Sequence, residues 1–256
     1  MCDLLAACFS TEYRAPKTLH KFMMRSIKRG DIDGWGLGFF LKNREAVVVK
    51  DTDLIIKEGM VLSAFDLVAR CIESEIILAH LRLASRKDLY GREYAHPFKD
   101  EFLDSQWIFA HNGYSREILG YKTSRNRIHE DPEFDSPRIF EFIRDKMIEY
   151  LRGHPTRSLF NAVRHAVKEL YNRYDGTFNF ALANSNILFV NLDGRHKYNN
   201  KVYMIFREKK GLEKAVIVTT IPRLTEEEWI VIRARNPYRG KLLMFSEGEL
   251  LYNADI

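Results

Sequence analysis

Apolar strand-like runs at both ends of the chain, separated by two amphipathic helices, constrain its fold more than any other feature. Before the helices, strands are predicted at residues 2–9, 39–41, 46–49, 75–83 and 106–110. After the helices, strands are predicted at residues 177–183, 187–191, 201–206, 215–220, 241–245 and 250–252. The helices themselves are predicted at residues 137–151 and 158–174, each with one apolar face. The pattern predicts one α+β domain over residues 1–256, with stacked sheets covered by helices that pack together.

The first half of the chain adds shorter elements. Helices are predicted at residues 17–29 and 61–72, and a turn-rich stretch at residues 31–38 leads into a hairpin. This stretch contains Gly34-Trp35-Gly36, and its glycines would let the backbone approach another group closely. The alternative is a glycine-rich hairpin entry in which Trp35 packs into the core. Residues 114–134 show little periodicity and predict a long loop.

Composition excludes several classes of function. The three cysteines include no C-x-x-C pair, which fits a reducing, cytoplasmic compartment and argues against structural zinc. The net charge of +5 comes from interspersed charges, and no aromatic and basic RNA-binding motif is present, so no nucleic-acid partner is predicted. No apolar run approaches the roughly 20 residues that span a bilayer, so no membrane association is predicted either.

Cys2 is the first candidate for chemistry. Removal of Met1 would leave a thiol and a free α-amine on one residue. A thiol of reference pKa about 8.5 needs a base to act as a nucleophile, and an α-amine of pKa about 7.7 to 8.0 can serve. The alternative is that Cys2 is a small apolar residue opening a buried strand.

Several motifs occur in the order seen in class II glutamine amidotransferases, a family of the N-terminal nucleophile hydrolases, which the chain resembles. They are Cys2, Gly34-Trp35-Gly36, His80-Leu81-Arg82-Leu83-Ala84, His96-Pro97-Phe98, His111-Asn112-Gly113 and Asp135. The later strands, with the segment 220–225, look like the rest of a stand-alone glutaminase domain. The resemblance implies a four-layer α-β-β-α sandwich of two mainly antiparallel sheets flanked by helices.

The resemblance also implies a role for each motif residue. Cys2 would be the nucleophile, and the Asn112 side-chain amide and the Gly113 N–H would stabilise the tetrahedral oxyanion. Arg82 would bind the α-carboxylate of glutamine through its planar guanidinium, and Asp135 would accept the α-ammonium. The alternatives are a surface arginine at a strand end for Arg82, a helix cap for Asp135, and a common turn for Asn112-Gly113.

The histidines invite two other interpretations, a Cys-His dyad and a metal site. His80, His96 and His111 lie in three separate segments whose spacing fits no helical metal motif. In the family the α-amine is the base and the histidines are structural, with His111 beside the bound substrate. We therefore expect no metal and no cofactor.

The leading hypothesis is hydrolysis of glutamine through a Cys2 thioester, giving glutamate and ammonia. One alternative is an amidase acting on another γ-glutamyl conjugate, and another is a non-catalytic regulatory or ligand-binding subunit. The substrate would be glutamine or another small γ-glutamyl molecule, and a separate synthase subunit could accept the ammonia. Two departures from the family pattern leave substrate choice open: Leu83 replaces a common Trp, and Ile221 precedes Pro222 where stand-alone members often carry an acidic residue.

Overall fold

A computed structural model gives the structure of most of the chain. It describes residues 2–28, 32–52, 55–57, 60–62, 64–83, 88–125, 128–154, 156, 158–195, 202–209, 213–221, 224–226 and 228–256. Some residues of the predicted motifs and turns therefore lie outside the described part, namely Gly30, Asp31, Ala84, Pro222 and Arg223.

The first sheet has seven strands in the order β13-β11-β12-β1-β6-β2-β3. Its strands are β1 (Asp3–Tyr13), β2 (Gly34–Phe40), β3 (Ala46–Asp51), β6 (Ser74–Arg82), β11 (Val202–Lys209), β12 (Glu213–Thr219) and β13 (Ile230–Ile232). The strand predicted at residues 75–83 is interior, as its apolar composition requires, and pairs antiparallel with β1 and β2. A separate small hairpin joins β4 (Ile55–Lys57) and β5 (Met60–Leu62).

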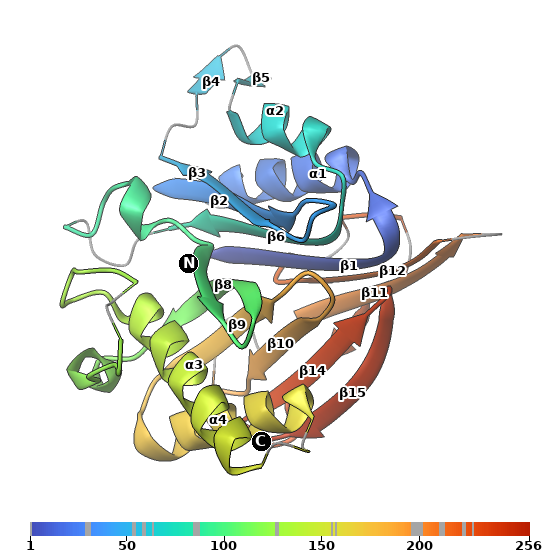
Figure 1. The fold of residues 1–256 in the computed structure, drawn as a ribbon. Helices are drawn as coiled ribbons and strands as arrows, with labels where there is room; N and C mark the ends of the chain where they lie inside the picture. The colour runs from blue at the N-terminus through green and yellow to red at the C-terminus, as the bar shows by residue number, and fades with distance from the viewer. Residues whose placement is uncertain are drawn as a thin grey trace.

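The second sheet has six strands in the order β15-β14-β10-β9-β8-β7, and its described pairings are also antiparallel. Its strands are β7 (Phe98–Phe102), β8 (Ser105–Tyr114), β9 (Thr177–Ala183), β10 (Leu188–Asp193), β14 (Gly240–Ser246) and β15 (Glu249–Asp255). The two sheets lie face to face, and the chain starts where β1, β6 and β8 approach one another (Figure 1).

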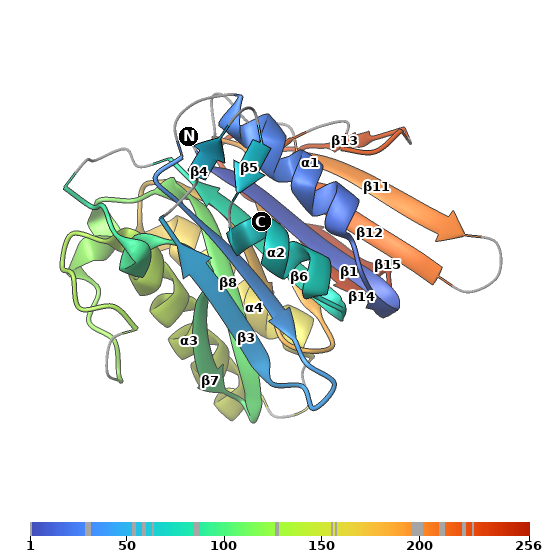
Figure 2. The same cartoon turned by 90° about the horizontal axis from the view of Figure 1, so that it is seen from above.

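Helices cover the two outer faces. The helices are α1 (Pro16–Ile27), α2 (Ala64–Cys71), α3 (Asp135–Gly153) and α4 (Leu159–Arg173), with short 3-10 turns η1 (Arg92–Tyr94) and η2 (Glu117–Gly120). Figure 2 shows α1 and α2 on the outer face of the first sheet and α3 and α4 beyond the second.

Three apolar cores correspond to the three junctions between these four layers. One lies under α1 and α2, one between the sheets, and one under α3 and α4. The predicted α-β-β-α sandwich is therefore confirmed.

Several boundaries differ from the sequence prediction. Residues 34–38 form most of strand β2 instead of a turn. Their glycines allow the segment His96-Pro97 to pack closely against this strand. A β-carbon at Gly36 would lie 1.9 Å from the His96 carbonyl oxygen, and one at Gly38 would lie 2.9 Å from Pro97. The close approach predicted for these glycines is thus real, and Trp35 also packs in the core as the alternative proposed, fully buried against Phe65.

Two other predictions were wrong at their ends. The helix predicted at residues 61–72 begins only at Ala64, because Met60–Leu62 is strand β5. The His111-Asn112-Gly113 motif lies inside β8 and does not follow it, since β9 pairs with all three residues. Strand β7 was not predicted.

Candidate active site

Cys2 lies at the start of β1, on the side facing the second sheet. Side chains alternate along a strand, and Leu4, Ala6 and Cys8 all belong to the core between the sheets. Cys2 shares their parity, so its side chain is directed into the same layer, at the open end of that core. Part of the residue remains accessible to solvent.

The Cys2 thiol contacts the main chain of one residue, Leu83. Its Sγ accepts a hydrogen bond from the Leu83 N–H at 3.4 Å and lies 3.5 Å from the Leu83 carbonyl oxygen. Burial raises the pKa of the Cys2 thiol, while the Leu83 hydrogen bond and the Arg82 charge partly oppose that rise. The resting group is therefore a neutral thiol at pH 7, and nucleophilic attack requires a base.

Asn112 connects the second sheet to Cys2. Its Nδ2 donates to the Cys2 carbonyl oxygen at 2.7 Å. Asn112 is almost completely buried and shares strand parity with Ile108 and Ala110, which face the first sheet. Two residues separated by 110 positions are thus joined by a direct bond.

Gly113 follows Asn112 where no side chain would fit. A β-carbon there would lie 2.0 Å from the Thr177 carbonyl oxygen and 2.7 Å from His111 Nε2. The glycine is therefore required by the contact between β8 and β9, and it keeps the main chain accessible beside Asn112.

Arg82 is a buried cation, and one nitrogen of its guanidinium is available for a ligand. The residue is only 5% exposed and lies on β6, in register with Gly34 of β2. Its Nη1 is buried and has no hydrogen-bond partner among the described residues, which do not include 84–87, while the guanidinium lies 5.7 Å from the centre of the Tyr94 ring. A buried guanidinium with unused donors can bind an anion, and a carboxylate suits its planar geometry. This excludes the alternative that Arg82 is a surface arginine.

Asp135 lies on a different side of the site. It is the first residue of α3, which begins two residues before the predicted start, and its N-cap is Phe134. Its Oδ2 accepts a hydrogen bond from the Ser115 N–H at 2.9 Å. Burial raises the pKa of the Asp135 carboxyl, whereas hydrogen bonds from main-chain N–H groups of Ser115 and the helix start oppose that rise. Among the described residues, no hydrogen bond or ion pair joins Asp135 to Arg82.

His111 faces the helices, away from Cys2, because it alternates with Asn112 along β8. Its Nε2 lies 3.0 Å from the Thr177 carbonyl oxygen and its Nδ1 lies 3.0 Å from Ser136 Oγ. A carbonyl only accepts, so Nε2 carries the proton. Burial lowers the pKa of His111, so the ring is neutral and Nδ1 accepts from the Ser136 hydroxyl. Both nitrogens are occupied by protein groups, and the ring supports the start of α3 next to Asp135.

His80 and His96 form a buried pair. Their ring centroids are 4.3 Å apart, and the described residues supply no hydrogen-bond partner to any of their four ring nitrogens. Burial, assisted by the Arg82 charge, lowers the pKa of His80 to about 3, and burial also holds the pKa of His96 well below its usual range. Within the described residues, neither ring is hydrogen-bonded to Cys2, and no three His, Cys, Asp or Glu side chains form a metal-binding group.

Two surface cavities formed by described residues lie outside this constellation. A cavity of about 490 Å³ opens beside the start of α1, and an apolar groove of about 440 Å³ lies beside α2. Neither is lined by Cys2, Arg82, Asn112 or Asp135, so the chemistry of the cluster does not depend on them.

Sequence reasoning missed several groups that position the site. The Leu83 peptide holds the thiol, Ser115 and Ser136 contact Asp135, and Asn179 lies opposite Asn112 on β9. Asn179 carried one usable signal: it is a polar residue between Phe178 and Phe180 in a strand that is otherwise mostly apolar.

Known proteins share sequence similarity with this chain. The sequence model of the family described as Glutamine amidotransferases class-II matches residues 1–255. A Haemophilus influenzae protein named "Putative glutamine amidotransferase" is 23% identical over 97% of this chain and 85% of its own length.

Solved structures share the fold. A predicted glutamine amidotransferase from Pseudomonas aeruginosa PA01 has a TM-score of 0.59 and 19% identity, with 98% of this chain and 95% of that chain covered. The glutamine phosphoribosylpyrophosphate amidotransferase of B. subtilis has a TM-score of 0.61 and 12% identity, with 99% of this chain covered. This chain corresponds to 49% of that longer enzyme. Within the described residues, no helix combines the length and apolar character needed to cross a membrane.

Proposed function

The chain belongs to the class II glutamine amidotransferases, and on that basis we propose that it hydrolyses the side-chain amide of glutamine, or another γ-glutamyl amide, through a thioester on Cys2. The observation that carries the proposal is the 2.7 Å hydrogen bond from Asn112 Nδ2 to the Cys2 carbonyl oxygen. It supports the proposal because it brings the nucleophile and an amide donor to one point between the sheets.

We propose that removal of Met1 frees the α-amine of Cys2 as the general base. The thiol proton passes to this amine as sulfur attacks the amide carbon, and the carbonyl oxygen becomes an oxyanion beside Asn112 Nδ2 and the Gly113 N–H. Collapse expels ammonia, which takes the proton from the amine. Water then attacks the thioester, releasing glutamate and restoring the thiol. The occupied nitrogens of His111, and the absence of a described Cys2–histidine hydrogen bond, favour the amine as base.

The same proposal assigns the substrate's charged end to Arg82 and Asp135. The unpartnered, buried Nη1 of Arg82 supports a bond to the α-carboxylate. Asp135 would accept the α-ammonium, and His111 would act on this end of the site by holding Ser136 and the start of α3. A helix-terminal role for Asp135 alone is the competing interpretation, and a substitution described below separates the two.

The test uses Met1-free protein verified by intact mass. Glutamate release is measured with glutamine and with γ-glutamyl-p-nitroanilide, which separates a glutaminase from an amidase for larger conjugates. Cys2→Ser should abolish turnover on both substrates and leave the fold intact. Cys8→Ser is the matched control, since Cys8 lies on the same strand and face but burial raises its pKa to about 11.

Labelling gives an independent readout. The glutamine analogue diazo-oxo-norleucine should add to Cys2 and leave Cys8 and the exposed Cys71 unmodified. An inactive, unlabelled Met1-free protein would contradict the proposal and favour a regulatory or ligand-binding subunit.

A further inference from the structure

Asn179 lies directly opposite the proposed oxyanion donor Asn112. The two residues are paired in the antiparallel register of β8 and β9. Their strand neighbours Ala110 and Ala181 both belong to the core between the sheets, so the two asparagine side chains project from the same face. Opposed residues of antiparallel strands have β-carbons about 4.5–5.5 Å apart, so both amides can reach a single atom.

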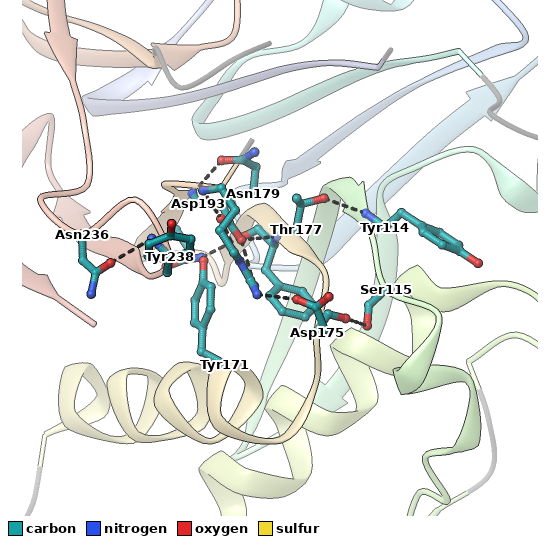
Figure 3. Close-up of polar contacts among 12 residues, drawn as sticks. Tyr114, Ser115, Tyr171, Asp175, Thr177, Asn179, Asp193, Asn236 and Tyr238 are labelled. Carbon is teal, nitrogen blue, oxygen red and sulfur yellow. Dashed lines mark hydrogen bonds and ion pairs between the residues drawn. The ribbon is translucent and has the colours of Figure 1, made fainter. Parts of the chain in front are cut away.

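The orientation of the Asn179 amide is fixed by a main-chain donor. The Asp193 N–H donates to Asn179 Oδ1 at 2.8 Å. An N–H group cannot accept, so the oxygen must occupy this position and the nitrogen must point the other way. Figure 3 shows the Asn179 oxygen directed at the Asp193 main chain and the nitrogen directed away from it.

The partner of Asn179 is itself rigidly held. Asp193 Oδ2 accepts from the Phe178 N–H at 2.7 Å, and Asp193 Oδ1 accepts from the Arg195 N–H at 2.7 Å. The Arg195 guanidinium lies 4.9 Å from the Tyr171 ring centre and forms an ion pair with Asp175 at 3.0 Å. This network is the cluster drawn in Figure 3, and it fixes the end of β10 against which Asn179 is oriented.

The side-chain nitrogen of Asn179 has no hydrogen-bond partner among the residues that the structure describes. The residue is 3% exposed, and Nδ2 is buried without a hydrogen bond. Leaving a buried donor unpaired is costly, and folded proteins rarely do so without a use for the group. Asn191 lies on the neighbouring strand β10, and its Nδ2 instead donates to Phe178 O and Tyr171 Oη on the helix side of the sheet. The two asparagines therefore differ in one respect that matters here: the Asn179 donor is free on the Cys2 side.

We propose that Asn179 Nδ2 is a third oxyanion donor, hydrogen-bonding the γ-carbonyl oxygen of the substrate as that oxygen becomes negative. This inference rests on the proposed function. Asn112 already directs one N–H to the Cys2 carbonyl, whereas no acceptor for Asn179 Nδ2 is present in the described part of the chain. A preoriented donor with no ground-state partner stabilises the transition state without first breaking a bond.

Two substitutions test the donor. Asn179→Asp retains the shape and the acceptor for the Asp193 N–H but replaces the free donor with oxygen. Asn179→Leu removes both polar atoms at similar volume. Removal of one oxyanion donor lowers kcat about 10²–10³-fold in a known hydrolase. Because two donors remain here, we expect kcat to fall at least about tenfold in each Asn179 variant. Asn191→Leu is the matched control, since it also loses two buried hydrogen bonds but faces the helices. It should lower the melting temperature and leave kcat within about twofold.

An inhibitor pair distinguishes a catalytic donor from a structural residue. The γ-aldehyde analogue of glutamine adds the Cys2 thiol to its carbonyl and places the resulting oxygen in the oxyanion position, whereas glutamate forms no such adduct. Asn179→Leu should weaken aldehyde binding by about the same factor as kcat and leave glutamate binding unchanged.

Unchanged kcat in both Asn179 variants, or equal weakening of the two inhibitors, would overturn this inference alone. A wild type that hydrolyses no γ-glutamyl amide would overturn the proposed function and this inference with it.

Discussion

Replacement of Gly113 by alanine should damage both stability and catalysis, because the added methyl group has no space. Its carbon would lie 2.0 Å from the Thr177 carbonyl oxygen and 2.7 Å from His111 Nε2. The first contact is with the main chain of a paired strand, so β8 and β9 must separate locally. The second contact displaces the ring that donates to that same carbonyl.

The cost can be worked from these two contacts. Overpacking a tightly packed site costs about 1–3 kcal/mol, and loss of the His111–Thr177 hydrogen bond adds about 1 kcal/mol. The sum is about 2–4 kcal/mol, which for a chain of this size lowers the melting temperature by about 5–15 °C. Movement of the Gly113 N–H by even about 1 Å should also lower kcat by about a hundredfold.

Gly120→Ala provides the matched control. Gly120 ends the short turn η2, and a β-carbon there meets nothing within 4 Å. Alanine at such a site is neutral or stabilises by up to about 1 kcal/mol, because it restricts the unfolded chain. Thermal unfolding and glutaminase assays of the two variants are compared with wild type. If Gly113→Ala matches Gly120→Ala in melting temperature and kcat, the steric reasoning is wrong.

Three further predictions follow from the same geometry. Asn112→Ala should lower kcat by about a hundredfold with little change in KM, and a change confined to KM would make Asn112 a binding residue. Asp135→Asn should lower kcat/KM for glutamine but not for an analogue without the α-amine, and an equal effect on both substrates would leave only the helix-terminal role. Acid should destabilise the fold, because the pKa of His80 is about 6.5 in the unfolded chain and about 3 in the folded protein. The contribution of neutral His80 to the free energy of unfolding is therefore complete above pH 6.5 and falls by about 1.4 kcal/mol per pH unit below it. Urea unfolding between pH 7 and 5 measures that slope, and His80→Leu should reduce it.

The sequence predicted the layers better than the boundaries, for identifiable reasons. Strand β6 was clear because both of its faces are buried, which gives a continuous apolar run. Strand β7 was missed because only Phe98 and Phe102 are fully buried, and the three residues between them are charged, as suits the edge of a sheet. The Asn112-Gly113 pair looked like a turn because local preference favours one, yet pairing with β9 overrides that preference.

The sequence predicted residues of the candidate site but not the groups that hold them in place. Cys2 and Asn112 were found from their residue types and order, and the structure joins them by a direct hydrogen bond. The Leu83 peptide could not be found that way, because any residue can supply a main-chain N–H. The placement of Asp135 relative to Arg82 was also beyond the sequence: Asp135 occupies the start of a helix, where it accepts a hydrogen bond from the Ser115 N–H, and Ser136 Oγ lies 3.4 Å from its Oδ1.

A simple rule of strand parity explains why residues so far apart in sequence meet at this end of the molecule. Alternate positions of β1, β6, β8 and β9 supply small or aliphatic side chains to the core between the sheets, including Leu4, Leu78, Ala110 and Ala181. Toward this end of the molecule, the same inward-facing row of each strand carries a polar group.

These four polar residues are Cys2, Arg82, Asn112 and Asn179. Apolar pairing fixes the register of each strand, and a slip of one residue would turn every one of these groups to the opposite face. The core between the sheets therefore positions the chemistry as well as stabilising the fold. For this reason we expect cavity-forming substitutions in that core, such as Leu78→Ala, to reduce kcat even though the side chain itself bears no reactive group.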